Sequence, residues 1–176
     1  MKKTVILVFL VLPIMVFAQH SEFSLDIITP FTGYFALGSD DPTANAIQFE
    51  VVAAEYLVFL NETFGIGLLV GGGILSTEQV YPYEGGVILP LSVSAQATIL
   101  HSDNLAWPVL IRAGVLPAFR DFLSSSGGSV GVYFHGCVMT GVVLRAINLR
   151  FLVGAATIDF QTLGLRLEAG FNWRYE

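Results

Sequence analysis

The side chains that could carry out acid–base or nucleophilic chemistry are few in this sequence, and they form no motif. His135 lies in the middle of an expected strand and is the first candidate. The residues that could act with it are Tyr133, Cys137, Ser92, Ser94 and Glu168. Nucleophilic catalysis needs a nucleophile, a base and an orienting group in a defined arrangement, and no short motif links these residues. We therefore predict that the chain is not an enzyme and that His135 is a hydrogen-bonded interior side chain.

Metal and cofactor binding are not indicated either. The histidines are far apart in the sequence and Cys137 is the only cysteine, so no zinc-site spacing is present. Asp40 and Asp41 could bridge to lipopolysaccharide through divalent ions, but solvated carboxylates in a loop are the simpler interpretation. We predict no metal site and no cofactor.

Eight charged residues lie at strand positions that share the polar face. They are Asp26, Glu50, Arg112, Arg145, Arg150, Arg166, Glu168 and Arg174. If that face is enclosed, these charges must pair, because a buried unpaired charge is very costly. We predict two ladders of ion pairs. The outer one contains Glu50, Arg112, Arg166 and Glu168, and the periplasmic one contains Asp26, Arg145, Arg150 and Arg174. A packed plug is the predicted result, with a gated or conducting interior as the alternative.

Glu55 does not fit this pattern. Strict alternation from Glu50 would point its carboxylate to the apolar face. A β-bulge within residues 51–54 would turn Glu55 back toward the polar face, and we predict such a bulge.

The elements that must position these charges are strands. From Leu163 to Glu176, apolar side chains alternate with glycine or polar ones almost without error, which is typical of a strand with two different faces. Eight such segments are expected, at about residues 23–35, 46–60, 64–76, 87–100, 106–119, 130–146, 149–160 and 163–175.

Composition decides which face is outside. Charged residues make up 12% of the chain, hydrophobic residues 54%, and the mean hydropathy is +0.70, whereas soluble domains are about 25% charged. Beyond the N-terminal segment no apolar run is long enough for a spanning helix. We predict an all-β fold, an eight-stranded antiparallel up-and-down transmembrane β-barrel with its apolar face toward lipid. The alternatives are a soluble lipocalin-like barrel, for which the charges are too few, and a helical membrane protein, which the period of two opposes.

Aromatic residues are expected to form two girdles at the ends of the strands. Those assigned to the periplasmic girdle are Phe23, Phe59, Phe64, Trp107, Phe151, Trp173 and Tyr175. Those assigned to the outer girdle are Phe31, Phe35, Phe49, Phe119, Phe134 and Phe160.

The N-terminal segment predicts export. Lys2 and Lys3 precede a short apolar run that ends at Ala18, which is the pattern of a cleaved signal peptide over residues 1–18. The barrel domain then covers residues 19–176. Its six arginines and fourteen acidic residues give a net charge of 6 − 14 = −8 without any lysine, which argues against nucleic acid as a partner.

These features together resemble the small outer-membrane barrels of the OmpA/OmpX/OmpW type. The resemblance rests on the signal peptide, the amphipathic strands, the aromatic girdles and the final strand Leu-x-Leu-x-Ala-x-Phe-x-Trp-x-Tyr at 165–175 with its preceding Leu163. It implies a monomer in the outer membrane of a diderm bacterium, surrounded by lipid and lipopolysaccharide. It also implies insertion by the barrel assembly machinery, which reads the last strand in that family.

The connections between strands alternate between short ones and longer polar ones, as in outer-membrane barrels with short periplasmic turns and longer external loops. The loop residues predicted to contact an extracellular ligand are Asp40, Asp41, Tyr81, Tyr83 and Asp121. We expect a structural or surface-interaction role, such as adhesion or host contact. The alternatives are a narrow channel or transporter for small or hydrophobic molecules and a lipid-modifying enzyme.

Overall fold

The computed structural model describes residues 19–36, 45–78, 86–120 and 128–175. The strands are β1 (His20–Ala36), β2 (Asn45–Phe59), β3 (Phe64–Glu78), β4 (Gly86–Ile88), β5 (Leu91–His101), β6 (Leu105–Arg120), β7 (Ser129–Leu144), β8 (Leu149–Ile158) and β9 (Thr162–Tyr175). A short 3-10 turn, η1 (Arg145–Ile147), joins β7 to β8. Among the described residues, no helix has both the length and the apolar character needed to span a membrane.

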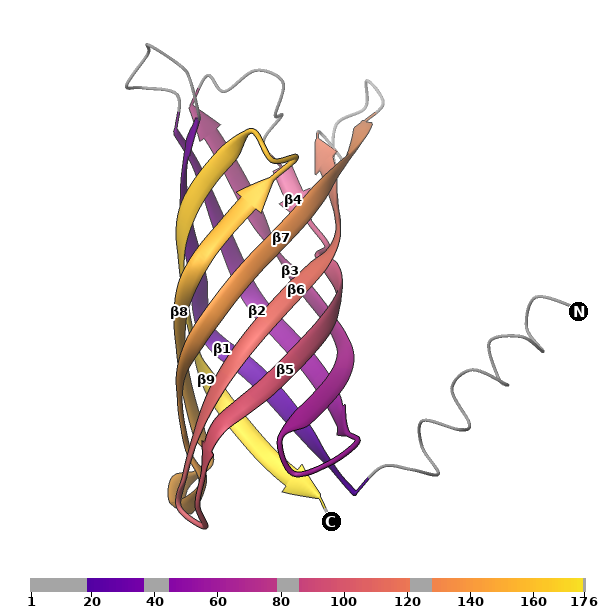
Figure 1. Cartoon of the computed structure of the whole chain (residues 1–176). Coiled ribbons are helices and arrows are strands. Elements are labelled where there is room, and N and C mark those ends of the chain that lie inside the picture. Colours follow the sequence, from indigo (N-terminus) through magenta and orange to yellow (C-terminus); the bar gives the residue numbers. More distant parts are fainter. Residues whose placement is uncertain (1–18, 37–44, 79–85, 121–127, 176) are drawn as a thin grey trace, which may run out of the picture.

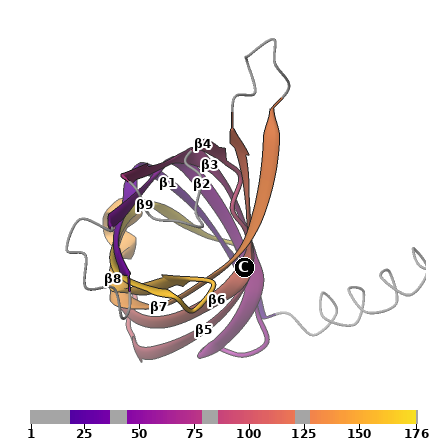
Figure 2. The same ribbon diagram turned by 90° about the horizontal axis from the view of Figure 1, so that it is seen from above.

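The strands form one closed antiparallel barrel (Figure 1). β1 pairs with β2 on one side and with β9 on the other, which closes the ring seen from above in Figure 2. β4 and β5 both lie between β3 and β6, so they are two parts of one interrupted strand. The wall of the barrel therefore consists of eight strands. The predicted fold class is therefore confirmed.

The break between β4 and β5 follows from Pro90, which has no N–H to donate to a neighbouring strand. The Pro90 carbonyl still accepts a hydrogen bond from Gly71 N at 3.0 Å, and Leu89 N donates to the Pro117 carbonyl at 3.0 Å. The wall therefore stays closed across the break, although the predicted segment 87–100 is divided into two strands.

The two ends of the barrel differ. β1 begins and β9 ends at the same end, which also carries the short connections after β2, β5 and β7 (Figure 1). We call this the terminus end. The segments 37–44, 79–85 and 121–127 connect strand ends at the opposite end, which we call the loop end. The short turn from β8 to β9 also lies at the loop end.

The apolar face is outside and the polar face is inside. Along β9, Leu165 and Leu167 are 54% and 44% exposed, whereas Arg166 and Glu168 between and beside them are buried. The same alternation runs along β5, where Leu91 and its apolar neighbours face outward and the serines face inward. A water-soluble barrel has the opposite arrangement, so the lipocalin-like alternative is excluded.

The aromatic prediction needs one correction. Phe59, assigned to the periplasmic girdle, is buried inside the barrel and stacks on His20 with ring centroids 4.3 Å apart. Phe23 and Trp173 stack on each other at 5.8 Å near the terminus end, where Tyr175 is exposed. A bulge explains the inward turn of Phe59, because it reverses the phase of β2 before the strand ends, as described below.

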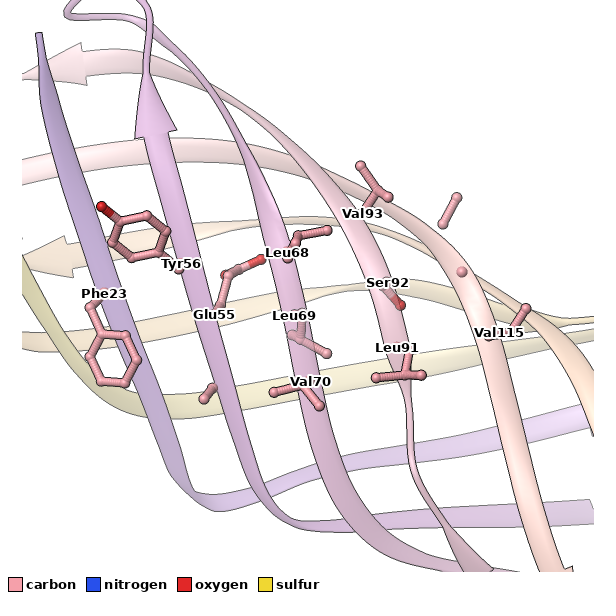
Figure 3. A pocket seen from close by; sticks show the side chains of 13 residues that line it. Phe23, Glu55, Tyr56, Leu68, Leu69, Val70, Leu91, Ser92, Val93 and Val115 are labelled. Atoms are coloured by element: carbon pink, nitrogen blue, oxygen red, sulfur yellow. The ribbon is translucent and has the colours of Figure 1, made fainter. Parts of the chain in front are cut away.

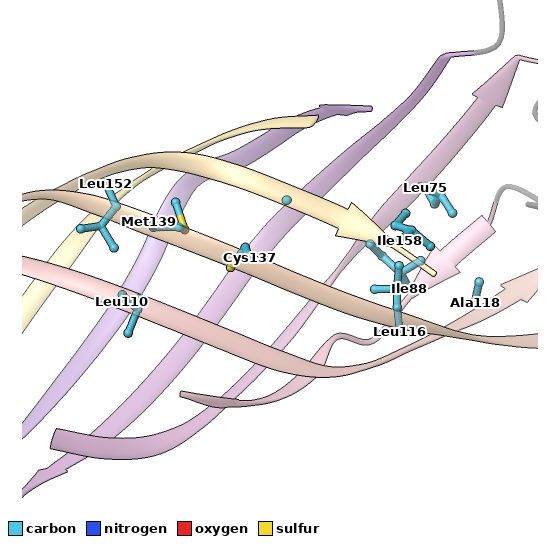
Figure 4. Packing of buried hydrophobic residues seen from close by; sticks show 10 residues of the cluster. Leu75, Ile88, Leu110, Leu116, Ala118, Cys137, Met139, Leu152 and Ile158 are labelled. Carbon is cyan, nitrogen blue, oxygen red and sulfur yellow. The ribbon is translucent and has the colours of Figure 1, made fainter. Parts of the chain in front are cut away.

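An apolar cluster lies inside the barrel, with part of it near the loop end and part along the middle of β6, β7 and β8 (Figure 4). It contains Leu75, Ile88, Leu110, Leu116, Ala118, Cys137, Met139, Leu152, Ala156 and Ile158. Ile88, Leu116 and Ile158 are fully buried and meet near the loop end. These three side chains lie on the loop-end side of the charged residues.

Candidate functional site

The middle of the interior is a network of buried ions. Its members come from alternate, inward-facing positions of five strands, so each charge is fixed by the phase of its strand. The carboxylates are Asp26 on β1, Glu50 and Glu55 on β2, and Glu168 on β9. The guanidinium groups are Arg112 on β6, Arg150 on β8 and Arg166 on β9. We call these seven residues the ionic network.

Arg112 is the centre of the ionic network. Its Nε and Nη2 donate to the two carboxylate oxygens of Glu55 at 2.8 and 2.7 Å. Its Nη1 donates to Glu168 Oε1 at 2.5 Å. Ser94 on β5 adds a hydrogen bond from its hydroxyl to Glu55 Oε1 at 2.5 Å. A planar guanidinium forked onto a carboxylate is the strongest form of such a contact.

The other two arginines extend the ionic network in opposite directions. Toward the terminus end, Arg150 donates to Glu55 Oε2 and to Asp26 Oδ2, both at 2.6 Å. Toward the loop end, Arg166 donates to the two oxygens of Glu50 at 2.7 and 2.9 Å. Its Nε also donates to Glu168 Oε1 at 2.6 Å.

The prediction that these charges form two separate ladders was wrong. The network is one connected cluster rather than two ladders, because Glu55 accepts from Arg112 and Arg150 at once. Arg150, assigned to the periplasmic ladder, is thus joined to the residues of the outer one. The two-ladder prediction failed because it assigned Glu55 to neither ladder, although the predicted bulge turned this residue inward.

A bulge at Val51 brings Glu55 inside. Opposite β3, Glu50 pairs with Gly73 and Val52 pairs with Gly72, so Val51 is the extra residue. Val51 and Val52 are both exposed to the outside, which reverses the phase of the strand between the two glutamates. The structure therefore places the bulge where the sequence argument put it.

Arg145 and Arg174 lie apart from the ionic network. Both line the mouth of the barrel at the terminus end, where Arg145 Nη2 is 3.4 Å from Glu22 Oε1. Glu22 was not among the predicted interior charges, although its spacing from Asp26 gave the same face. The predicted grouping of Arg145 and Arg174 with Asp26 and Arg150 was wrong. Arg145 in η1 and Arg174 near the end of β9 lie closer to the terminus end than Asp26 and Arg150 do.

The ionic network carries more negative than positive charge. Four carboxylates face three guanidinium groups, so the formal charges do not cancel. Asp26 Oδ1 and Glu168 Oε2 have no hydrogen-bond partner within the described residues. Arg150 Nη2 lies 3.9 Å from Glu168 Oε2, which is too long for a hydrogen bond.

His135 is buried inside the barrel, and neither ring nitrogen has a hydrogen-bond partner within the described residues. The predicted interior position of His135 is confirmed, and its hydrogen bonding stays a prediction. Ser94 is bonded to Glu55 instead, and Glu168 is taken up by arginines. The structure does not join these residues to His135 in a catalytic arrangement. Within the described residues, no cluster of acidic, histidine or cysteine residues could hold a metal ion.

A hollow of about 540 Å³ lies on the strands from β1 to β6 (Figure 3). Most of its lining side chains are exposed apolar ones such as Leu68, Val70 and Val93. Glu55 and Ser92 also border it, but the Glu55 carboxylate is occupied by its interior partners. The hollow is therefore lined mainly by apolar groups. The predicted loop contacts Asp40, Asp41, Tyr81, Tyr83 and Asp121 lie outside the described residues.

Comparisons with known proteins agree with this architecture. No protein-family model matches the chain, and no curated protein matches it. Among solved structures, Neisserial surface protein A is similar with a TM-score of 0.60 at 12% identity, covering 86% of this chain and 95% of that one. Ail, the attachment invasion locus protein of Yersinia pestis, matches with a TM-score of 0.49 at 16% identity, covering 88% and 98%. A structure of Ail with the heparin analogue sucrose octasulfate gives a TM-score of 0.40 at 15% identity, covering the same shares.

The chain therefore has the fold of a small eight-stranded antiparallel β-barrel with an apolar outer face, and in this fold it is similar to Neisserial surface protein A.

Proposed function

We propose that this chain is an integral outer-membrane barrel with a closed interior, whose role is to hold its loop end at the cell surface for contact with extracellular partners. The terminus end then faces the periplasm. The observation that carries the proposal is the combination of an apolar outer face with an interior that contains the ionic network and the apolar cluster. A barrel of eight strands has room inside for side chains only.

The filled interior argues against transport. An ion crossing the barrel would have to separate Arg112 from Glu55 and then pass fully buried Leu116 and Ile158. Breaking buried charge pairs costs about 3–5 kcal/mol for each partner removed. We therefore place the chain with plugged barrels rather than with channels.

The loop end supports a surface role. β6 and β7 extend beyond the rest of the wall, and β7 pairs with β8 only from His135 onward (Figure 2). Asp159 bonds both backbone groups of Phe134, with N···O distances of 2.6 and 3.0 Å. Backbone N–H and C=O groups of alternate residues in a strand point to the same neighbour. Those of Val130 and Val132 therefore point to the same side of β7 as those of Phe134, where no described strand pairs with them. Such a strand edge can pair with an extended polypeptide.

Several predicted partners remain part of this proposal. They are lipid and lipopolysaccharide around the apolar face, the barrel assembly machinery during insertion, and an extracellular ligand at the loops. A monomeric state and the cleavage of residues 1–18 likewise remain predictions.

Planar-bilayer recording of the purified barrel tests the closed interior. We expect no stable single-channel steps, with a general porin as the positive control. Reproducible steps would instead establish the channel alternative.

Adhesion of bacteria that display the barrel tests the surface role. The matched control replaces segments 37–44, 79–85 and 121–127 by short Gly-Ser linkers while the strands stay intact. Binding to epithelial monolayers should fall to the level of cells without the barrel. Equal adhesion by both forms would refute a surface-interaction role for these segments.

A further inference from the structure

The mouth at the terminus end contains a polar cavity that the proposed function does not use. Its volume is about 350 Å³, and it is lined by His101, Asp103, Arg145, Asn148, Asn172 and Arg174. These residues come from the end of β5, the β5–β6 turn, η1 and its following residue, and the end of β9. Asn148 closes η1 in a left-handed conformation with φ of 53°, which asparagine tolerates better than most residues.

Two guanidinium groups converge on one imidazole in this cavity. Arg145 Nη1 and Nη2 lie 3.2 and 3.3 Å from the two ring nitrogens of His101. Arg174 Nη1 lies 3.3 Å from His101 Nε2, the ring nitrogen that Arg145 Nη1 also contacts. One imidazole nitrogen has at most one lone pair to offer, so it cannot serve both arginines as acceptor. Two like charges are therefore held close together around a weak acceptor.

The carboxylate of Glu22 compensates the charge of Arg145 only in part. Glu22 is buried and lies 3.4 Å from Arg145 Nη2, at the long limit of a hydrogen bond, while it also accepts from Asn172 at 3.3 Å. Arg145 Nε is buried without a hydrogen-bond partner within the described residues. Burial, together with the nearby Arg174, lowers the pKa of Arg145, whereas Glu22 acts in the opposite direction. The charged form of Arg145 thus lacks a full partner.

We propose that this cavity binds a phosphoryl group between Arg145 and Arg174, over the edge of His101. A tetrahedral oxyanion supplies several acceptors at once, and guanidinium forks match its geometry. Each arginine can keep its present position and donate to a different oxygen. Asp103, which lines the same cavity and is exposed, opposes anion binding by its charge. The phosphoryl group comes either from free phosphate or from a phospholipid headgroup at this end of the barrel.

Phosphate binding is measured by phosphorus NMR and calorimetry on the folded barrel in a phosphate-free maltoside detergent. Inorganic phosphate is the first probe and short-chain phosphatidic acid is the second. We expect saturable binding that weakens about tenfold in R145Q and in R174Q, as for loss of one charged hydrogen bond. In D103N, binding should tighten severalfold, because an opposing charge is removed. R120Q, which changes an arginine at the other end of the barrel, is the matched control and should leave binding unchanged.

The outcomes separate the two sources. Saturation by inorganic phosphate identifies a free-anion site, and saturation by phosphatidic acid alone identifies a headgroup site. The proposal is overturned if neither probe saturates below about 10 mM, a weak affinity by any standard. It is also overturned if R145Q and R174Q, still heat-modifiable on gels and so folded, bind as tightly as the unchanged chain.

Discussion

Replacing Arg112 by methionine should be among the most damaging single changes in the barrel. The substitution removes three hydrogen bonds, two to Glu55 and one to Glu168. Methionine fills a similar volume beside Met139, so the loss is one of charge rather than of packing. After the change Glu55 keeps its bonds to Arg150 and Ser94.

The magnitude follows from the charge count of the ionic network. It has four carboxylates and three guanidinium groups, so R112M leaves four carboxylates with two guanidinium groups. Removing one partner of a buried pair costs about 3–5 kcal/mol, and R112M should lie at the upper end because it enlarges an existing excess. E55Q replaces one acceptor oxygen by an NH2 group, so at most one of the two Arg112–Glu55 hydrogen bonds can remain, and it leaves three carboxylates and three guanidinium groups in the network. It should cost only about 1–3 kcal/mol.

The double variant R112M/E55Q distinguishes charge balance from lost contacts. Its interior has three carboxylates and two guanidinium groups, the same excess as the unchanged chain. We expect its destabilisation to be smaller than the sum of the single values by about 1–3 kcal/mol.

The free energy of unfolding is measured by urea titration from lipid vesicles, with the fluorescence of Trp107 and Trp173 as the signal and heat-modifiable migration as a check of the fold. Trp107 lies on the outer face, where it is half exposed. If E55Q proves as costly as R112M, or if the two effects add, the charge excess does not govern stability and the reasoning is wrong.

Three further changes test the positions of individual strands. G170A should destabilise the barrel by about 2–3 kcal/mol, because a Cβ there would lie 2.5 Å from the backbone and carboxylate of the paired strand, whereas G72A, with its nearest neighbour at 3.9 Å, should be neutral in the same urea titration. Deletion of Val51 removes the bulge but keeps both glutamates of β2 inside, so the folded gel form should persist, while deletion of Leu167 makes two inward-facing residues adjacent and should abolish it. Cys137 is buried, so a water-soluble maleimide should label it only after unfolding, and rapid labelling of the folded barrel would contradict its inward orientation.

The sequence predicted the architecture well because one physical variable, the alternation of apolar and polar side chains, determines most of it. Alternation and composition alone were enough to assign Leu163 to Tyr175 to a strand and its apolar face to lipid. The boundaries at Pro90 were missed because an apolar residue on either side hides the break in the ladder. The inward position of Phe59 was missed because the expected girdles ignored the phase reversal upstream.

The candidate site was less predictable, because pairing depends on the tilt of strands around the ring. Arg150 could be placed inside from its phase, but its distance from Glu55, 95 residues away, depends on how far each strand is shifted against the next. The apolar cluster was not predicted, for the same reason. Leu75, Ile88 and Ile158 belong to three strands, and only the closed barrel brings them together.

The buried ions inside the barrel are explained by what the chain must avoid before the barrel closes, which is insertion into a membrane as a helix. Buried ion pairs add little stability compared with a well-packed apolar interior of the same volume, so stability alone does not explain seven buried ions. Apolar residues on both faces would, however, turn β9 into a continuous apolar segment, because Arg166 and Glu168 interrupt it now. Together with β8 and the short turn between the two strands, it would exceed the length of about 18 residues at which apolar segments insert into membranes as helices. Charged residues on the inner face keep each strand amphipathic until the barrel closes, and the closed barrel then satisfies them with one another.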